Sequence, residues 1–337
     1  MNKYPFKKIL ITGGTGFIGS TYIEKILNEF TGFEILNFDR MSYASSSLTN
    51  DLFSKNSNFN FLKLDISDPN ALDDALSDYT PDLIINFAAE SHVDNSIVSS
   101  ADFIQSNIIG TYNLLQQAQI ISKSNNDFLF HHISTDEVYG DLSFHQDAFT
   151  EKSKYRPSSP YSSSKASSDL LVMSWGRTYK IPYLITNCSN NYGPRQYVEK
   201  FIPKIIRNLV NDDLIPVYGK GENIRDWIFV EDHIDAIFSL HKDRFRNEIY
   251  NIGGNDEKSN LDLVRLIIKE MSELKNISIN SDPIEFIEDR EGHDLRYAIN
   301  SSKILKATGW KPSTSFDCGI SKTIDWYLNN SDWWGSK

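Results

Sequence analysis

A glycine-rich stretch near the start of the chain constrains the fold more than any other feature. Gly13, Gly14, Gly16 and Gly19 fall between an apolar segment, residues 7–11, and a helical pattern that runs to about residue 30. Such glycines permit a tight turn and a close approach of the backbone to a pyrophosphate, which the following helix N-terminus attracts. The stretch therefore predicts a dinucleotide-binding βαβ unit.

A carboxylate follows the second predicted strand at the spacing that this fold uses for ribose. Residues 33–38 form that strand, and Asp39 lies 20 residues after Gly19. A carboxylate there can accept both ribose hydroxyls and repels a 2′-phosphate, so Asp39 favours NAD over NADP. Arg40 leaves two alternatives open, because an arginine can hold a 2′-phosphate or lie along the adenine. We favour the second.

Strand and helix patterns alternate over the first half of the chain. Further strands are predicted at residues 59–64, 82–89, 128–133 and 183–187, with helices at 69–79, 101–121 and 159–179. Continuous apolar strands are typical of a parallel sheet covered on both faces. The fold class is therefore α/β, with a Rossmann-type doubly wound parallel sheet and a smaller α/β substrate-binding domain at the C-terminus.

The pattern changes after residue 187, where a second domain is expected to begin. We assign residues 1–187, with a returning segment at about 228–254, to the NAD-binding domain, and residues 188–227 and 255–337 to the substrate domain. A short strand near residues 249–254 should rejoin the first sheet. The helix at 261–274, the irregular charged loop at 286–293 and the helical tail at 304–334 are expected in the smaller domain.

Three reactive residues follow one of the buried strands. Thr135, Asp136 and Glu137 come directly after the apolar run 128–133. The carboxyl ends of parallel strands are where ligands bind in open α/β sheets. Adjacent carboxyl groups can act as acid and base if their surroundings separate their pKa values. The structural alternative is a polar strand end that caps the next turn.

A tyrosine and a lysine lie four residues apart at the start of a later helix. Tyr161 and Lys165 share a helix face because of this spacing. A nearby ammonium group stabilises a phenolate, so we expect Lys165 to lower the pKa of Tyr161 and to hold a ribose hydroxyl. Tyr161 would then be a usable base near neutral pH.

Composition excludes several other functions. The chain has 337 residues, a net charge of -11 and no Lys/Arg-rich run, which argues against a nucleic-acid partner or an anionic membrane surface. Two distant cysteines, Cys188 and Cys318, give neither a disulfide framework nor zinc spacing, and they fit a reducing cytoplasm. We expect no metal: His92 is interpreted as a structural loop residue, and the pair 131–132 as packing or hydrogen-bonding histidines.

Taken together, these motifs resemble the nucleotide-sugar short-chain dehydrogenases of the extended type, most closely the dTDP-glucose 4,6-dehydratases. The resemblance covers essentially the whole chain, and the Thr135–Glu137 triplet is its most specific part. It implies transient oxidation at sugar C4, loss of water across C5–C6 and return of the hydride to C6. Tyr161 would take the C4 hydroxyl proton, Thr135 would bind the C4 oxygen, Glu137 would remove the C5 proton and Asp136 would protonate the leaving hydroxyl. A homodimer formed through two helices per subunit is also implied.

The same resemblance implies two sets of binding residues. NAD, tightly bound and regenerated each cycle, would contact the motif glycines and a set of cavity residues: Gly13, Gly16, Phe17, Ile18, Gly19, Asp39, Arg40, Met41, Ser42, Asp65, Ile66, Phe87, Ala88, Ala89, Ser91, Ser106, Tyr161, Lys165 and Asn191. The nucleotide sugar would contact Ser91, Thr135, Asn190, Lys200, Phe201, Pro216, Val217, Tyr218, Arg225, Asn260, Asp289, Arg290, Glu291, Gly292 and His293, with Arg225 on the diphosphate.

Some positions depart from the family pattern. The segment 40–45 differs from the usual one, Ser106 replaces threonine, Asn95 replaces arginine and Glu291 replaces proline. Glu291 adds a negative charge beside the expected nucleotide loop, so the choice between thymine and uracil stays open. The alternatives are a UDP-glucose 4,6-dehydratase, another nucleotide-sugar enzyme such as a UDP-glucuronate decarboxylase, and a non-catalytic dinucleotide sensor.

Overall fold

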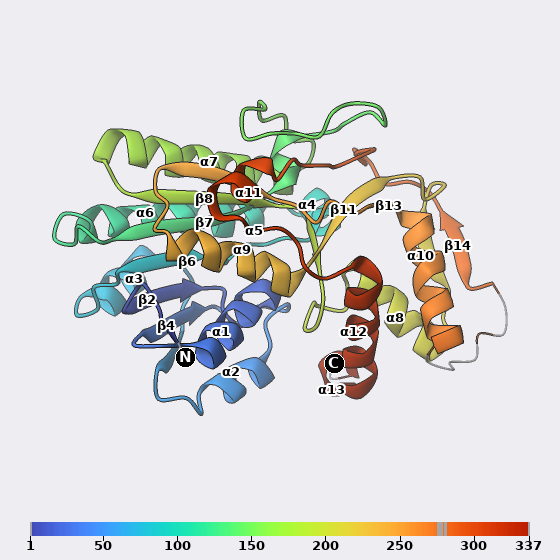
Figure 1. Cartoon of the computed structure of the whole chain (residues 1–337), viewed down its shortest axis with the longest axis horizontal. Helices are drawn as coiled ribbons and strands as arrows, with labels where there is room; N and C mark the ends of the chain where they lie inside the picture. Colours follow the sequence, from blue (N-terminus) through green and yellow to red (C-terminus); the bar gives the residue numbers. More distant parts are fainter. Residues whose placement is uncertain (1, 275–278, 280–281, 336–337) are drawn as a thin grey trace.

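A seven-stranded parallel sheet forms the centre of the protein, described here by a computed structural model for residues 2–274, 279 and 282–335 (Figure 1). The strand order is β12-β8-β7-β6-β2-β4-β5. The strands are β2 (Lys8–Thr12), β4 (Glu34–Asp39), β5 (Phe59–Lys63), β6 (Leu83–Asn86), β7 (Leu129–Thr135), β8 (Tyr183–Cys188) and β12 (Glu248–Ile252). The predicted Rossmann-type sheet is confirmed, and β12 pairs in parallel with β8 as the returning strand.

Helices cover both faces of this sheet. Side chains alternate along β2, so Ile9 and Ile11 pack toward α1 (Phe17–Glu29) and α9 (Val230–Lys242), while Leu10 packs toward the opposite face. That face is covered by α3 (Pro69–Leu76), α6 (Gly110–Ile121) and α7 (Pro160–Tyr179). Shorter elements complete this part: β1 (Asn2–Lys3), β3 (Phe30–Thr31), α2 (Ser47–Phe53), α4 (Val93–Val98) and α5 (Ala101–Phe103).

The helix predicted at residues 101–121 contains a wider segment. A π-helical stretch, η1 (Ile104–Ile109), joins α5 to α6. There the Asn107 side chain accepts from the Glu90 backbone N–H at 2.9 Å and donates to Ser164 at 2.8 Å. Apolar spacing did not predict this bulge, because the segments on either side each keep a helical period and the extra residue only shifts one relative to the other.

A second core lies beside the sheet, on the right in Figure 1. It contains side chains such as Ile205, Val217, Leu263 and Ile320. Its elements are β9 (Asn190–Tyr192), β11 (Ile224–Phe229), β13 (Glu257–Ser259), β10 (Ile215–Tyr218), β14 (Ile284–Ile287), α8 (Phe201–Asn211), α10 (Asn260–Lys269), η3 (Glu270–Leu274), α12 (Phe316–Asn329) and α13 (Asp332–Gly335). This separate core supports the proposed division of the chain into two domains.

Two expectations for the C-terminal part were wrong. The tail does not pack wholly on the smaller core, because α11 (Ser302–Thr308) lies against β12 and α9 and buries Ile304 in the core of the first sheet. The loop predicted from residue 286 begins with Phe286 and Ile287 still in β14. Helical spacing marks an apolar face without identifying the core that covers it. In the part of the chain that the structure describes, we find no helix with the length and apolarity needed to cross a bilayer.

Gly254 marks a close approach between two backbone segments, and this gives a stability prediction. A Cβ atom at Gly254 would lie 1.7 Å from the Trp227 carbonyl oxygen, whereas at Gly309 it meets no described heavy atom within 4 Å. We expect Gly254→Ala to lower the free energy of unfolding by about 3 kcal/mol or more. Gly309→Ala should cost only about 1 kcal/mol, through its positive φ. Equal losses in denaturant titrations would contradict this packing.

Candidate active site

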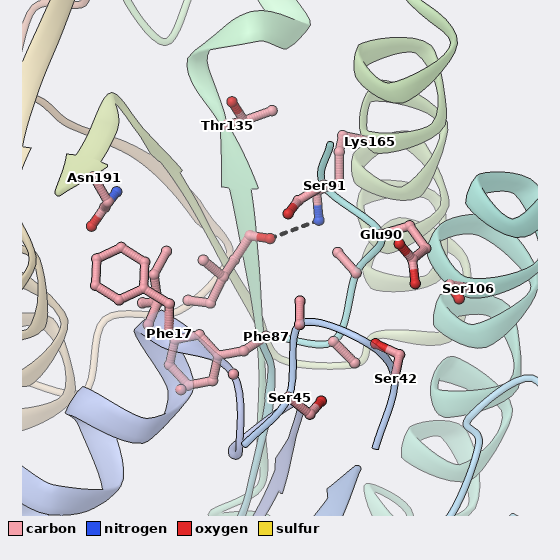
Figure 2. Close-up of a pocket in the computed structure, with 18 of the residues that line it drawn as sticks. Phe17, Ser42, Ser45, Phe87, Glu90, Ser91, Ser106, Thr135, Lys165 and Asn191 are labelled. Atoms are coloured by element: carbon pink, nitrogen blue, oxygen red, sulfur yellow. Dashed lines mark hydrogen bonds between the residues drawn. The ribbon is translucent and has the colours of Figure 1, made fainter. Parts of the chain in front are cut away.

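A cavity opens at the carboxyl ends of the parallel strands (Figure 2). The glycine loop after β2, the segments after β4 and β6, the end of β7 and the start of α7 all contribute to its wall. Most of the residues predicted to bind the cofactor line it: Gly13, Gly16, Phe17, Ile18, Gly19, Asp39, Arg40, Ser42, Asp65, Ile66, Phe87, Ala88, Ala89, Ser91, Ser106, Tyr161, Lys165 and Asn191. The cavity thus joins the predicted dinucleotide and catalytic residues.

The glycine loop leaves no room for side chains. Gly13 has a φ of +72°, and a Cβ atom there would lie 2.6 Å from the backbone nitrogen of Ala88. At Gly19 a Cβ atom would lie 2.5 Å from the Gly13 carbonyl oxygen. The loop therefore lies directly against the end of β6, and the following helix α1 directs its free N–H groups into the cavity.

The Asp39 carboxylate is held in place by its own loop. It accepts from the backbone N–H groups of Thr15 at 3.1 Å and Met41 at 2.9 Å, and from the Ser45 hydroxyl at 2.8 Å. Arg40 forms ion pairs with Glu90 and with Asp65, the latter at 3.5 Å. Because two carboxylates already neutralise Arg40, it is poorly placed to discriminate for a 2′-phosphate.

Met41 is the one predicted cofactor residue that is absent from the described cavity wall. Its φ is +59°, and its sulfur lies 3.5 Å from the Thr15 hydroxyl. The side chain packs against the glycine loop, so any role of Met41 in cofactor binding stays a prediction.

The two adjacent carboxyl groups at the end of β7 have different surroundings. Burial, followed by the charges of Glu137 and Asp226, raises the pKa of Asp136 well above its usual value. Burial also raises the pKa of Glu137, but Arg225, Arg290 and Lys200 oppose this increase. The local field therefore favours a protonated Asp136 beside a more readily ionised Glu137, which suits an acid and a base respectively.

Thr135 ends β7 and also caps the short helix η2 (Asp136–Tyr139). Its hydroxyl oxygen accepts from the Glu137 backbone N–H at 3.3 Å. The capping reading and the catalytic reading of this stretch are therefore compatible, because Thr135 also lines the cavity and forms a hydrogen bond that lowers the pKa of Tyr161.

The expected effect of Lys165 on Tyr161 is wrong for this structure. Burial, then the charges of Glu137 and Cys188, raise the pKa of Tyr161 well above its usual value. The Lys165 ammonium instead donates to the Ile133 carbonyl oxygen at 2.8 Å, the dashed line at Lys165 in Figure 2. It also lies 3.3 Å from His132 Nε2. Helix spacing put both residues on one face, but it did not reveal the Ile133 carbonyl acceptor and the neighbouring His132 on β7.

The predicted substrate residues divide into two groups. Ser91, Thr135, Asn190 and Lys200 line the cavity, and Lys200 Nζ donates to the Ser91 carbonyl oxygen at 2.6 Å. The others lie on elements of the smaller core or on the segment after β14, and they do not line the described cavity: Phe201, Pro216, Val217, Tyr218, Arg225, Asn260, Asp289, Arg290, Glu291, Gly292 and His293. The side chain of Val217 is buried in that core, so only its backbone is available to a ligand.

Contacts across the site bring this second group toward the first. Asp94 on α4 accepts from Arg290 at 3.1 Å and from the Tyr218 hydroxyl at 3.3 Å. Arg225 donates to the Asp294 carbonyl oxygen at 2.9 Å and lies 4.3 Å from the centre of the Tyr297 ring. Arg225 and Arg290 both influence Glu137, so their positive charge reaches the catalytic carboxyl groups.

Sequence reasoning missed several cavity residues. Ser45, Cys188, Gln196 and Tyr197 all line it. Tyr197 packs against Tyr43 with ring centres 5.5 Å apart, joining the loop after β4 to the segment before α8. No periodic or spacing signal marks the three loop residues, and the apolar pattern of β8 does not show that its last residue, Cys188, lines a cavity. The interpretation of the histidine pair is confirmed for His131, which is fully buried and lies within hydrogen-bonding distance of His241 and Thr186.

The fold and the site define a dinucleotide-binding enzyme with the tyrosine–lysine arrangement of short-chain dehydrogenases. The family model described as GDP-mannose 4,6 dehydratase matches residues 10–323. The dTDP-glucose 4,6-dehydratase of Neisseria meningitidis serogroup B is 46% identical, over 97% of this chain and 95% of that protein. This chain therefore belongs to the dTDP-glucose 4,6-dehydratase family.

Solved structures of the same family superpose over nearly the whole chain. The dTDP-glucose 4,6-dehydratase of Bacillus anthracis in complex with NAD is 38% identical with a TM-score of 0.86, covering 98% of this chain and 99% of that one. The Streptomyces venezuelae enzyme, with NAD and a further ligand bound, is 36% identical with a TM-score of 0.89, covering 97% and 98% respectively.

The surroundings of Asp39 predict how the cofactor preference can be changed. Asp39→Asn keeps the shape of the side chain but removes its charge, and with it a charge-assisted hydrogen bond to ribose and the repulsion of a 2′-phosphate. We expect NAD affinity to fall by about 10-fold or more, while NADP affinity falls less or rises. Calorimetric titration with both dinucleotides checks this. An unchanged ratio of the two affinities would contradict the role of Asp39.

Proposed function

We propose that this protein is a dTDP-glucose 4,6-dehydratase that converts dTDP-glucose to dTDP-4-keto-6-deoxyglucose and water. The observation that carries the proposal is the pair Asp136 and Glu137 at the end of β7, beside Tyr161 in a dinucleotide cavity. Elimination of water across C5–C6 needs an acid and a base at neighbouring atoms, and this pair supplies both. Membership of the dehydratase family supports the same reaction.

NAD fits the cavity on chemical grounds. The glycine loop and the N-terminus of α1 line the cavity and can receive a pyrophosphate, Asp39 offers carboxylate oxygens to a ribose, and the small side chains of Ala88 and Ala89 form part of the wall. When bound, NAD would supply the hydride acceptor for C4 and the hydride donor for C6. Lys165 would hold a ribose hydroxyl, and Phe17 and Phe87, close together in Figure 2, would shield that part of the cavity from water.

The chain's own residues would manage the protons. Tyr161 accepts the C4 hydroxyl proton as the phenolate, a form that burial disfavours and the hydrogen bond with Thr135 favours. Thr135 donates a hydrogen bond to the C4 oxygen as the ketone forms. The ketone acidifies the C5 hydrogen, which Glu137 removes. Asp136, kept protonated by burial and by its charged neighbour, donates a proton to the departing C6 hydroxyl. Each general acid or base contributes on the order of 10²- to 10⁴-fold.

The positive groups of the smaller core would hold the nucleotide diphosphate. Arg225, Arg290 and Lys200 all act on Glu137 electrostatically, and so their positive charge reaches the catalytic end of the cavity. In a chain with a net charge of -11, such a local cluster is needed to attract an anionic nucleotide sugar. The planar fork of Arg225 suits a phosphate oxygen pair.

A panel of three substrates tests the reaction class. The protein is incubated with dTDP-glucose, UDP-glucose and UDP-glucuronate, and the products are weighed by mass spectrometry. We expect loss of water from dTDP-glucose. Preferential loss of water from UDP-glucose would change the assigned nucleobase of the substrate from thymine to uracil. Loss of carbon dioxide from UDP-glucuronate would mean a decarboxylase. Binding of NAD with no turnover of any substrate would mean a dinucleotide sensor.

The division of labour between the two carboxyl groups gives a kinetic prediction. Glu137→Gln keeps the oxidation machinery but lacks the base for C5. We expect it to oxidise C4 and accumulate bound reduced nicotinamide, seen by its absorbance, while dehydration falls by at least about 10²-fold. Glu285→Gln, an exposed site on β14, should behave as wild type. Normal dehydration by Glu137→Gln would refute the assigned base.

We also propose that the protein acts as a cytoplasmic homodimer through α6 and α7. These helices expose apolar side chains that a partner copy would cover, namely Tyr112, Ile120 and Leu170, and Ile109 at the end of η1 adds to them. Tyr112 and Trp175 already pack together between the two helices, with ring centres 5.9 Å apart. The described cysteines are both free, Cys188 buried and Cys318 exposed, which supports a reducing compartment.

The proposed interface predicts a change of molecular mass in solution. Leu170 is 57% exposed and lies on α7, whereas Leu214 is 51% exposed and lies near the smaller core. Leu170→Glu would place a charge in the dimer interface, so light scattering should detect a monomer. Leu214→Glu should remain dimeric. A dimeric Leu170→Glu variant, or a monomeric wild type, would contradict this interface.

A further inference from the structure

A buried carboxylate that the reaction does not use lies beneath the catalytic residues. Asp169 follows Tyr161 and Lys165 at successive intervals of four residues, so all three lie along one face of α7. Its side chain is completely buried. A buried carboxylate is costly unless hydrogen bonds and an opposite charge compensate it, so its surroundings show what it does.

One carboxylate oxygen of Asp169 is hydrogen-bonded to the end of β7. Oδ2 accepts from the Ser134 hydroxyl at 2.9 Å, the Tyr155 hydroxyl at 2.9 Å and the Asn187 amide at 3.4 Å. Asn187 also donates to the Thr135 carbonyl oxygen at 3.1 Å. Asp169 is therefore bonded directly to the residue before Thr135, and through Asn187 to Thr135 itself.

The other oxygen of Asp169 and the ammonium group of Lys165 both lie near one ring nitrogen of His132. Asp169 Oδ1 lies 3.5 Å from His132 Nε2, and the same nitrogen lies 3.3 Å from Lys165 Nζ. His132 Nδ1 lies 3.2 Å from the Asn86 amide nitrogen, whose amide oxygen accepts from the Thr12 hydroxyl at 2.6 Å. With Asn86 as the donor at Nδ1, a neutral His132 carries its proton on Nε2, which lies between the Asp169 carboxylate and the Lys165 ammonium group.

We propose that Asp169 is a positioning residue for the oxidation of C4, acting through His132 and Lys165 and through the end of β7. This inference rests on the dehydratase function proposed above. The carboxylate holds the Lys165 ammonium group in its charged form inside the protein. It also fixes the end of β7 that carries Thr135. The positions of Lys165 and Thr135, on the two sides of the reacting carbon, thus both depend on this one buried carboxylate.

The groups around this pair agree with the proposal. Lys165 faces Asp169 and Tyr161 on α7, His132 on β7 and Cys188 on β8, while Asp169 also faces Tyr155 and, on η2, Tyr139. Burial lowers the pKa of Lys165 to about 8, and Asp169 is the main opposing charge. Burial raises the pKa of Asp169 to about 6, opposed by Lys165 and by the hydrogen bonds from Ser134, Tyr155 and Asn187. Near neutral pH, Asp169 is therefore ionised while Lys165 is protonated.

The test isolates the oxidation step. In a Glu137→Gln background the reaction with dTDP-glucose stops after C4 oxidation, so the rate of reduced-nicotinamide formation can be measured against pH. If the Glu137→Gln protein forms no reduced nicotinamide, the proposed function itself fails. If it does, Asp169→Asn is added to it, with the exposed Asp74→Asn as the matched control.

We expect Asp169→Asn to move the alkaline limb of this profile downward by about one to two pH units. The loss of a nearby opposite charge shifts a pKa by about 1–3 units, and Asp169 is the main charge that keeps Lys165 protonated. Lys165 then loses its proton at lower pH, and oxidation fails earlier. A merely structural role would lower the rate at all pH values without moving the limb. An unmoved limb in a folded Asp169→Asn protein, or the same shift in Asp74→Asn, would overturn the proposal.

A second variant keeps the proposal testable if Asp169→Asn does not fold. Tyr155→Phe removes one hydrogen bond from the carboxylate and leaves every formal charge in place. The folded-state pKa of Asp169 should rise, so Asp169 is neutralised at higher pH and the acid limb of the oxidation profile moves upward. An acid limb at the wild-type position would contradict the role of Asp169.

Discussion

The division of acid and base work depends on the unequal surroundings of two neighbouring carboxyl groups at the end of β7. Both Asp136 and Glu137 are taken out of water, which raises the pKa of each. Positive charges from Arg225, Arg290 and Lys200 act on Glu137, while Asp136 meets the negative charges of Glu137 and Asp226. Since these cations belong to segments outside the first sheet, the acid and the base are distinguished only when both parts of the chain fold together.

Much of this arrangement could be predicted from sequence because its signals are local. The glycines between β2 and α1, Asp39 at the end of β4 and the triplet after β7 each occupy a strand end. Parallel strands bring their carboxyl ends to one edge of a sheet. The start of α3 is equally local, since the Asp68 side chain caps this helix by accepting from the backbone N–H groups of Asn70 and Ala71. Such features depend on a few adjacent residues and need no knowledge of distant contacts.

The remaining features depend on contacts between distant segments. Lys165 was expected to act on Tyr161, but its ammonium group contacts His132 and the Ile133 carbonyl oxygen. Residue spacing along the helix could not show these contacts with a strand. Asp169 carried no recognised motif, yet it gathers Ser134, Tyr155 and Asn187 around one carboxylate. The placement of α11 beside β12 likewise follows from which core its apolar face meets. These are properties of the packed molecule, and a linear pattern does not contain them.

The central claim is that hydrogen removed from one sugar carbon is returned to another within the same active site. The most direct measurement uses dTDP-glucose carrying deuterium at C4 and locates the isotope in the product by mass spectrometry and NMR. The account predicts a product lighter by one water molecule with the deuterium retained at C6. A product without deuterium at C6, or an unchanged sugar, would contradict it.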